Sequence, residues 1–277
     1  MFSSDETRTR AKILASKGYF PGELPPVFRT TTFGENIESI IHEWYKYNIV
    51  KTETKTIKYG KKTFPKSNAY TYNVGAFEPD TVSKPKRQYE RRNLDVVHPV
   101  PQAFLIYEIA ENFRRLSKQL SQNCYSLDKV TISDKYSRGV AHINFDAHKA
   151  KKDFIEHSSD WLVRTDISRF YPSIYTHSIS WSLYGKEDVK SDIAKFRGSV
   201  GDRLDQLIRS GNRNQTIGIP IGPETSRILA ECISSSIDHY IAEHRKKLRS
   251  GKVDRMQDDW FIGCGHLEKS RELAGSW

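Results

Sequence analysis

The sequence predicts an α+β protein in which amphipathic helices pack against short strands. Apolar residues recur at helical spacing in segments 103–121 and 218–248, and segment 49–75 alternates branched or aromatic residues with lysine and threonine. Two further apolar stretches adjoin acidic residues in the sequence, one at Asp166 and one at the doublet Asp258-Asp259. These patterns place acidic residues where strands are expected to end or turn.

The composition fits a globular protein with a basic surface. The chain has 277 residues, of which 37% are hydrophobic and 12% aromatic, enough for a sizeable core. Its formal net charge of +10 at pH 7 would attract polyanions, and nucleic acid is the expected partner. The alternative is a basic protein whose charge only aids solubility.

The cysteines and the N-terminal segment indicate in which cellular compartment the protein is expected. Cys124, Cys232 and Cys264 are far apart and odd in number, which suits small core residues in a reducing compartment. Residues 1–20 mix both charges and lack the apolar run of a signal peptide. Because no stretch approaches the roughly 20 apolar residues of a membrane span, we expect a cytoplasmic protein without membrane association.

The N-terminal segment, 1–35, is polar, with a Pro/Gly breaker at 20–26 that favours an extended or turn conformation. A short amphipathic helix is expected over 37–47. One face of that helix would carry Ile37, Ile40, Ile41 and Trp44.

Basic residues mark the next two segments. Segment 49–75 is expected to form one or two β-hairpins, whose lysines and aromatic residues could grip phosphates and stack on bases or simply protect a strand edge. Segment 79–101 holds further cations among prolines, as expected of a connector or an exposed strand.

A surface helix is expected over 103–121, where one apolar stripe faces the core. Segment 133–152 then combines glycine and serine with several cations, just before the first carboxylate strand. In an enzyme that transfers nucleotides, cations at that position could bind the phosphates.

The segment DWLVRTDISRFYPSIY predicts an apolar strand that ends at Asp166. A strand-end aspartate leaves its carboxylate at the sheet edge, free to bind a cation, although a lone aspartate there is more often a turn former. Tyr171 lies five positions further on, so after a turn its ring could lie under a bound sugar.

A Gly/Pro loop is expected before a long helix that starts near Pro223. Leu229, Ile233, Ile237 and Ile241 recur every four residues, so this face should pack beneath the sheet. The loop glycines allow either a ligand to approach closely or the chain to bend freely.

The segment VDRMQDDWFIG predicts a hairpin with Asp258 and Asp259 at its tip. Two adjacent acids repel each other by roughly 1 kcal/mol or more unless a cation offsets the charge, although a solvated turn tolerates them. Side by side with the strand that ends at Asp166, this hairpin would bring three carboxylates together. Such a cluster can hold two divalent cations about 4 Å apart for phosphoryl transfer.

Three motifs in this sequence resemble the reverse transcriptase (RNA-directed DNA polymerase) family. They are DISRFYPSIYTHSISWSLYGK (166–186), GIPIGPETSRILAE (218–231) and RMQDDWFIG (255–263), and the similarity extends over roughly residues 90–270. The bacterial members of the abortive-infection and antiphage-defence type are the most similar in pattern. The resemblance implies a right-hand polymerase with fingers and palm.

The resemblance also implies roles for single residues. Asp166, Asp258 and Asp259 would form the catalytic triad for two Mg²⁺ ions, with Mn²⁺ as a possible substitute and the Ile167 carbonyl as a further ligand. Tyr171 would discriminate against a ribose 2′-hydroxyl. The remaining nucleotide-binding candidates are the loop residues Pro220 and Gly222 and the basic residues Arg92, Arg138 and Lys152.

Two positions depart from the family pattern, and so does the length. Met256 stands where the family has an aromatic residue, and Pro220 starts a loop in which many relatives carry glutamine. On this resemblance, residues 1–90 are an N-terminal extension and the start of the fingers, 91–160 the fingers, and 161–277 the palm. The chain ends soon after the doublet, so we expect an incomplete palm and a missing thumb.

The expected activity is two-metal transfer of dNTPs to a primer in bacterial antiviral defence. The partners would be an RNA template and a DNA or protein primer, with an associated noncoding RNA or defence protein as a further possibility. One alternative is a catalytically inactive remnant that only binds nucleic acid. Another is an intron or retron type of enzyme, although the sequence shows no maturase or nuclease segment.

Overall fold

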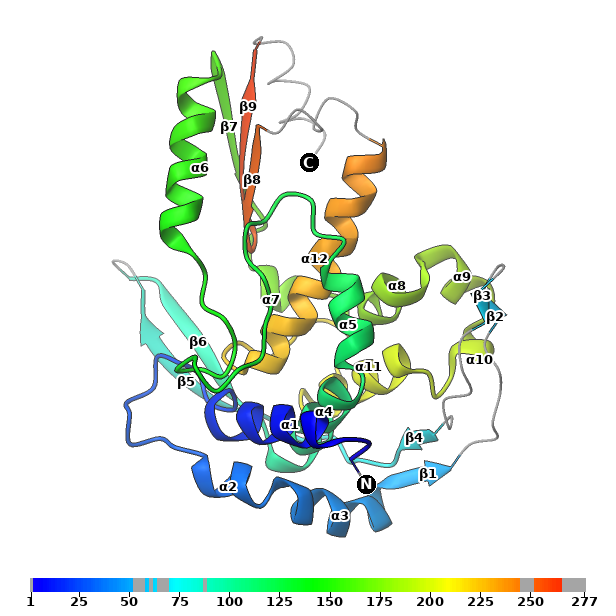
Figure 1. Cartoon of the computed structure of the whole chain (residues 1–277). Coiled ribbons are helices and arrows are strands. Elements are labelled where there is room, and N and C mark those ends of the chain that lie inside the picture. Colours follow the sequence, from blue (N-terminus) through cyan, green and yellow to red (C-terminus); the bar gives the residue numbers. More distant parts are fainter. Residues whose placement is uncertain are drawn as a thin grey trace.

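A computed structural model of the protein describes residues 2–51, 58–59, 62–63, 70–86, 89–244 and 252–265. Helices form a broad base, and a three-stranded sheet flanked by two helices stands above that base (Figure 1). The mixed α+β class predicted from the sequence is confirmed. Among the described helices, none is long and apolar enough to cross a membrane.

The three-stranded sheet joins the two segments that carry the acidic motifs. Its strands are β7 (Trp161–Asp166), β9 (Asp259–Cys264) and β8 (Val253–Met256), in the antiparallel order β7-β9-β8. Asp166 pairs with Asp259, and Met256 pairs with the same Asp259 across the hairpin. The predicted strand and hairpin are therefore confirmed, and they lie side by side.

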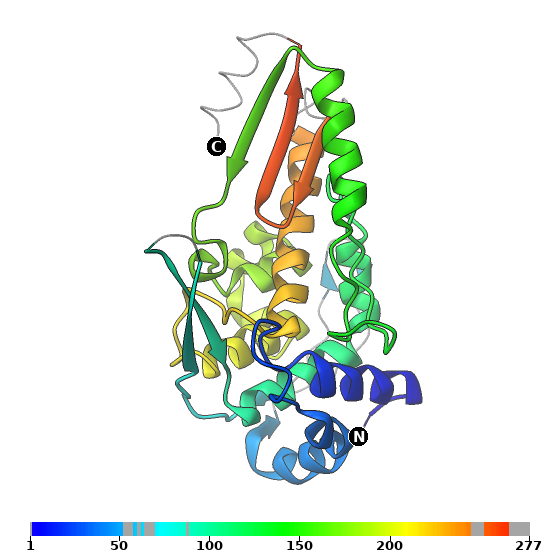
Figure 2. The same ribbon diagram turned by 90° about the vertical axis from the view of Figure 1, so that its left-hand side faces the viewer.

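Each face of this sheet has its own helix. Trp260 and Ile262 are buried with Val163 and Val253 on the face toward α12 (Glu224–His244), where Ile241 packs against them. The helix α6 (Phe145–His157) contacts both β8 and β9 (Figure 2). Successive residues of a strand point to opposite faces of the sheet. The hydrophobic face is therefore separate from the face that carries Asp166 and Asp259.

The helix α12 confirms the predicted long helix, but its stripe differs from the prediction. Only Ile241 of the predicted stripe packs against the sheet. Leu229 and Ile233 are buried in the core of the base instead, and Ile237 is 39% exposed. Asp238 is fully buried in its place because its carboxylate pairs with Arg255 of the sheet. An ion pair has replaced the apolar contact that periodicity alone predicts.

The core of the base is built around α4 (Pro99–Glu111), whose residues from Pro101 to Ala110 are all buried. The single surface helix predicted for 103–121 was therefore wrong: the chain breaks at Asn112 and continues as α5 (Phe113–Leu120). Burial of Glu108 in α4 is offset by Arg203, which donates to both of its carboxylate oxygens at 2.9 Å. The other helices of the base are α1 (Asp5–Lys17), α2 (Thr31–Glu35), α3 (Ile37–Asn48), α7 (Phe170–Ser173), α8 (Ser178–Tyr184), α9 (Lys186–Ser191), α10 (Ile193–Phe196) and α11 (Val200–Ser210).

Short antiparallel pairs complete the fold. β1 (Ile49–Lys51) pairs with β4 (Tyr70–Tyr72), and β2 (Lys58–Tyr59) pairs with β3 (Lys62–Thr63), as the hairpin prediction for 49–75 requires. The lysines proposed there to grip phosphates lie outside the residues whose side chains are described.

A two-stranded ribbon projects from the base (Figures 1 and 2). It consists of β5 (Asp80–Pro85) and β6 (Arg91–Val96), which the sequence predicted as a connector or exposed strand. All of β5 is exposed, as are the first three residues of β6. The ribbon presents the cations Lys84 and Arg92 as a cross-strand pair.

The three cysteines are free thiols. Cys232 and Cys264 are buried, as predicted, whereas the prediction of a core position was wrong for Cys124, which is exposed.

Candidate active site

The three candidate carboxylates converge at one end of the sheet. Asp166 is the last residue of β7, Asp259 is the first residue of β9 opposite it, and Asp258 occupies the turn between β8 and β9. The Ile167 amide donates to the Asp258 carbonyl at 3.3 Å, so the turn is also tied to the chain that leaves β7. Antiparallel pairing thus brings together residues that lie 93 or so positions apart.

The three carboxylates repel one another. Burial raises the pKa of Asp258 above its ordinary value, the Asp258 backbone amide opposes that rise, and the neighbouring carboxylates of Asp166 and Asp259 add to it. Asp166 and Asp259 are exposed and Asp258 is half-buried. The group is therefore reachable from solvent and would be stabilised by a cation.

The two segments that carry the acids share an uncommon backbone feature. Gln257, just before Asp258, has φ 57°, and Arg169, three residues after Asp166, has φ 52°. Residues other than glycine rarely occupy this left-handed region, and holding one there costs on the order of 1–3 kcal/mol. Surrounding contacts must therefore hold both turns in place.

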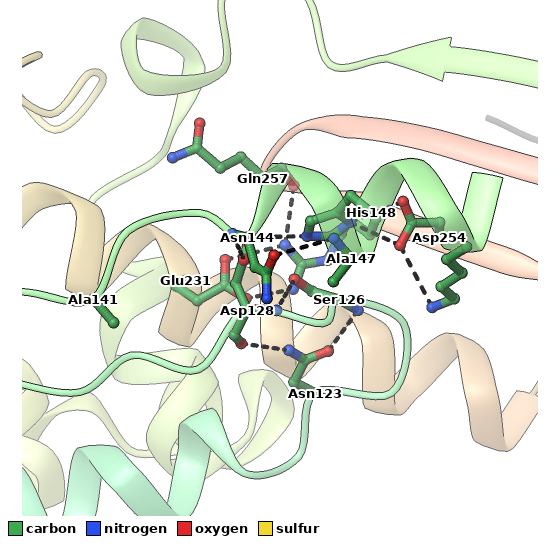
Figure 3. Close-up of polar contacts among 12 residues, drawn as sticks. Asn123, Ser126, Asp128, Ala141, Asn144, Ala147, His148, Glu231, Asp254 and Gln257 are labelled. Atoms are coloured by element: carbon green, nitrogen blue, oxygen red, sulfur yellow. Dashed lines mark hydrogen bonds and ion pairs between the residues drawn. The ribbon is translucent and has the colours of Figure 1, made fainter. Parts of the chain in front are cut away.

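One of those contacts fixes β8 from the side of α6. The His148 ring nitrogen Nδ1 lies 2.9 Å from both oxygens of Asp254, and its Nε2 lies 3.1 Å from Asp128 (Figure 3). Lys151 of the same helix lies 3.5 Å from Asp254. Both His148 and Asp254 are buried, so this cluster ties α6 to the strand that leads into the turn.

Tyr171 lies beside the loop that precedes α12. Its carbonyl accepts a hydrogen bond from the Ile219 amide at 3.0 Å, and the Ile174 carbonyl accepts one from Gly218 at 2.8 Å. Burial raises the pKa of the Tyr171 phenol, and the carboxylate of Asp258 is among the charges that raise it further. The backbone of Tyr171 is thus tied to the loop before α12.

The loop glycines approach protein atoms. A side chain on Gly222, whose φ is 134°, would collide with Pro21 at 2.3 Å. One on Gly218 would come within 3.3 Å of the Pro172 carbonyl. Pro220 is buried between them. Gly222 thus matches neither alternative suggested by the sequence, close approach of a ligand or free bending of the chain, because it packs against Pro21.

The three candidate cations lie in different surroundings. Arg138 donates to Glu224 at 3.0 Å, to the Gly222 carbonyl at 2.8 Å and to the Phe20 carbonyl. This guanidinium holds the N-terminal segment to the loop, so its proposed role as a phosphate clamp needs correction. Arg92 lies on the exposed ribbon, 3.8 Å from Glu23, and Lys152 is half-buried on α6.

Sequence reasoning missed the contact that joins the ribbon to the loop. Asp95 of β6 and Ile221 of the loop exchange two hydrogen bonds, one of them through the Asp95 carboxylate. It missed the buried partners of β8 as well. Sequence spacing cannot predict such pairs. Some of the partners are about a hundred residues apart in the chain, and others lie on a helix and a strand that pack together only in the folded protein.

The fit of a divalent cation follows from donor chemistry. Within the described residues, no three His, Cys, Asp or Glu side chains are grouped closely enough to hold a metal ion as they stand. The donors at the turn are nevertheless all oxygens, which Mg²⁺ prefers, and their mutual repulsion is what a cation would relieve. By donor chemistry alone, the carboxylates of Asp166, Asp258 and Asp259 suit such an ion.

Comparison with known proteins gives limited similarity. No protein-family model matches the chain, and no curated protein matches it. Among solved structures, the chain is similar to the telomerase of Candida albicans in complex with a TWJ fragment of telomeric RNA, with a TM-score of 0.38 and 12% sequence identity over 95% of this chain. The chain spans 48% of that protein, about half of its length.

Proposed function

We propose that the protein is a nucleotidyltransferase of the reverse transcriptase type, which adds dNTPs to a primer in bacterial antiviral defence. The observation that supports this most directly is the register of the sheet, which sets Asp166 opposite Asp259 with Asp258 beside them. Carboxylates in such a cluster can hold the two metal ions that phosphoryl transfer uses.

Each residue of the site has a proposed task. The carboxylates of Asp166, Asp258 and Asp259, with the Ile167 carbonyl, hold two Mg²⁺ or Mn²⁺ ions. When bound, these ions supply activation of the attacking hydroxyl and neutralisation of the triphosphate. Tyr171 lies against the sugar of the incoming nucleotide.

Positive charge for the phosphates comes from other elements. Arg92 and Lys84 face each other across the exposed ribbon, where both side chains are accessible to a polyanion. Lys152 stays a candidate for phosphate binding. Arg138 does not, because its guanidinium already bonds Glu224 and the Gly222 carbonyl. The template would be RNA, and the primer DNA or a protein hydroxyl, with a noncoding RNA or a defence protein as a further partner.

Labelled dNTP incorporation by the purified chain tests the proposal. The reaction contains Mg²⁺ and either an RNA template with a DNA primer or no nucleic acid, and Asp258→Asn serves as the control. Template-dependent product that is lost in Asp258→Asn supports reverse transcription. Label attached to the protein without template supports protein priming.

Equal incorporation by the wild-type chain and Asp258→Asn would contradict the assignment. Incorporation by neither, from a folded chain that still binds RNA, would favour the nucleic-acid-binding remnant instead.

A further inference from the structure

Arg255 of β8 is buried beneath the acidic turn. Its side chain is 1% exposed, although arginine is a residue type seldom found inside proteins. It points to the face of the sheet that α12 covers, away from Asp254 on the same strand. Its charge must therefore be satisfied by nearby protein groups.

Two carboxylates of α12 hold the guanidinium from one side. Nε donates to Asp238 at 2.8 Å, and Nη2 donates to Asp238 at 2.9 Å. Nη1 and Nη2 donate to the two oxygens of Glu231 at 3.1 and 2.6 Å. Two forked contacts fix the plane of the guanidinium, which a single point contact would leave free to rotate.

The remaining N–H group of Arg255 reaches the acidic turn itself. Nη1, which also donates to Glu231, donates to the Gln257 carbonyl at 3.0 Å. Gln257 is the residue with φ 57°, and Asp258 follows it directly. A continuous set of hydrogen bonds thus runs from α12 through Arg255 to the peptide group that orients Asp258.

We propose that Arg255 is a positioning residue, which holds the strained Gln257 peptide so that Asp258 faces Asp166 and Asp259 for metal binding. This inference rests on the proposed function, because it assigns Arg255 to the metal site of that reaction. Lysine cannot replace arginine here. An ammonium could keep one ion pair with α12, but it lacks the planar fork that reaches both carboxylates and the carbonyl.

Metal binding by the full chain tests the inference without relying on turnover. The concentration of free Mn²⁺ is followed by electron paramagnetic resonance during titration of wild type, Arg255→Lys and Asp258→Asn. Loss of a residue that orients metal ligands typically weakens metal binding by about 10–100-fold. We expect Arg255→Lys to raise the Kd for Mn²⁺ by at least about tenfold on that basis.

A matched control is available in Arg203. This arginine is also buried, with side-chain exposure of 4%, and it is also forked to a carboxylate, that of Glu108, and bonded to a carbonyl, that of Gly198 at 2.7 Å. It lies in α11 in the base, away from the acidic turn. Arg203→Lys should lower the melting temperature but leave the Kd for Mn²⁺ unchanged.

A double substitution separates positioning from general stability. Glycine adopts positive φ without strain, so Gln257→Gly removes the part of the role of Arg255 that consists of holding a strained residue. In the Gln257→Gly background, Arg255→Lys should therefore raise the Kd for Mn²⁺ by a clearly smaller factor than in wild type. If Arg255→Lys does not fold, Glu231→Gln, which loosens one fork only, should raise the Kd in the same direction.

The outcomes distinguish the two proposals. If Asp258→Asn weakens Mn²⁺ binding and Arg255→Lys behaves like Arg203→Lys, the role of Arg255 is overturned and the metal site stands. An equal effect of Arg255→Lys with and without Gln257→Gly also overturns positioning through the turn. If wild type and Asp258→Asn bind Mn²⁺ equally, the proposed function itself fails.

Discussion

Asp95 and Ile221 hold each other through two hydrogen bonds: the Asp95 amide donates to the Ile221 carbonyl at 2.7 Å, and the Ile221 amide donates to the Asp95 carboxylate at 2.8 Å. The first residue belongs to the exposed basic ribbon and the second to the loop before α12. Burial raises the pKa of Asp95, and the bond from Ile221 acts in the opposite direction. The ribbon is thereby fixed to the loop that Tyr171 contacts.

Removing this link should destabilise the fold. Asp95→Ala leaves the Ile221 amide without its carboxylate partner, and an unsatisfied group of this kind costs about 1–3 kcal/mol. The free energy of unfolding in urea measures the loss. Asp80→Ala, on the exposed strand of the same ribbon, is the control and should change that free energy by less than about 0.5 kcal/mol. Equal effects of the two substitutions would contradict the prediction.

The pH dependence of stability should report on Asp202. Burial raises the pKa of this carboxyl, while the Gly198 amide, which donates to it at 2.7 Å, partly opposes the rise. A raised folded-state pKa means that the folded protein binds the proton more tightly than the unfolded chain does, so stability increases as pH falls. The stability of wild type relative to Asp202→Asn should therefore rise between neutral pH and about pH 4, the ordinary range of an aspartate.

Urea unfolding of both proteins at several pH values gives this difference directly. If the difference in free energy of unfolding between wild type and Asp202→Asn stays constant or shrinks on acidification, the folded state does not raise the pKa of Asp202.

Divalent cations should stabilise the chain through the acidic turn. A ligand at ten times its Kd adds about 1.4 kcal/mol to the free energy of unfolding. We expect Mg²⁺ to raise the melting temperature of wild type but not of Asp258→Asn. Without metal, Asp258→Asn should be at least as stable as wild type, because it removes a carboxylate whose ionisation is disfavoured by burial and by Asp166 and Asp259. Thermal melts with Mg²⁺ and with a chelator provide both measurements, and equal stabilisation of the two proteins would place the cation elsewhere.

Sugar selection should depend on the ring of Tyr171. If the Tyr171 ring lies against the sugar as proposed, Tyr171→Ala opens space at the 2′ position, so incorporation of rNTPs relative to dNTPs should rise by at least about tenfold. Tyr171→Phe keeps the ring and should leave the ratio unchanged. The ratio of the two values of kcat/KM is the measurement. A change in Tyr171→Phe as large as that in Tyr171→Ala would assign selection to the hydroxyl instead.

Local patterns predicted the elements that carry the acidic residues. The strand that ends at Asp166, the hairpin around Asp258 and the helix after Pro223 all follow from short-range periodicity and turn chemistry. Their convergence followed only from the assumption that the strands lie side by side, which the pairing of Asp166 with Asp259 bears out.

The rest depended on contacts that periodicity does not encode. The sequence predicted Ile237 as a sheet-facing residue, but Asp238 takes that place because a buried arginine requires a charged partner. Arg138 was placed by its charge alone, and its hydrogen bonds to Phe20 and Gly222 arise from tertiary packing. Burial of α4 on all sides likewise follows from the number of elements around it, which no single segment reveals.

The helix α12 makes the sheet and the base one cooperative unit. Its first half contributes Leu229 and Ile233 to the core of the base, and its second half packs Ile241 against the sheet. Between them, Asp238 fastens β8. Unfolding of the base would therefore release the sheet too, and backbone amides of β9 and of α4 should exchange with solvent deuterium through the same global opening.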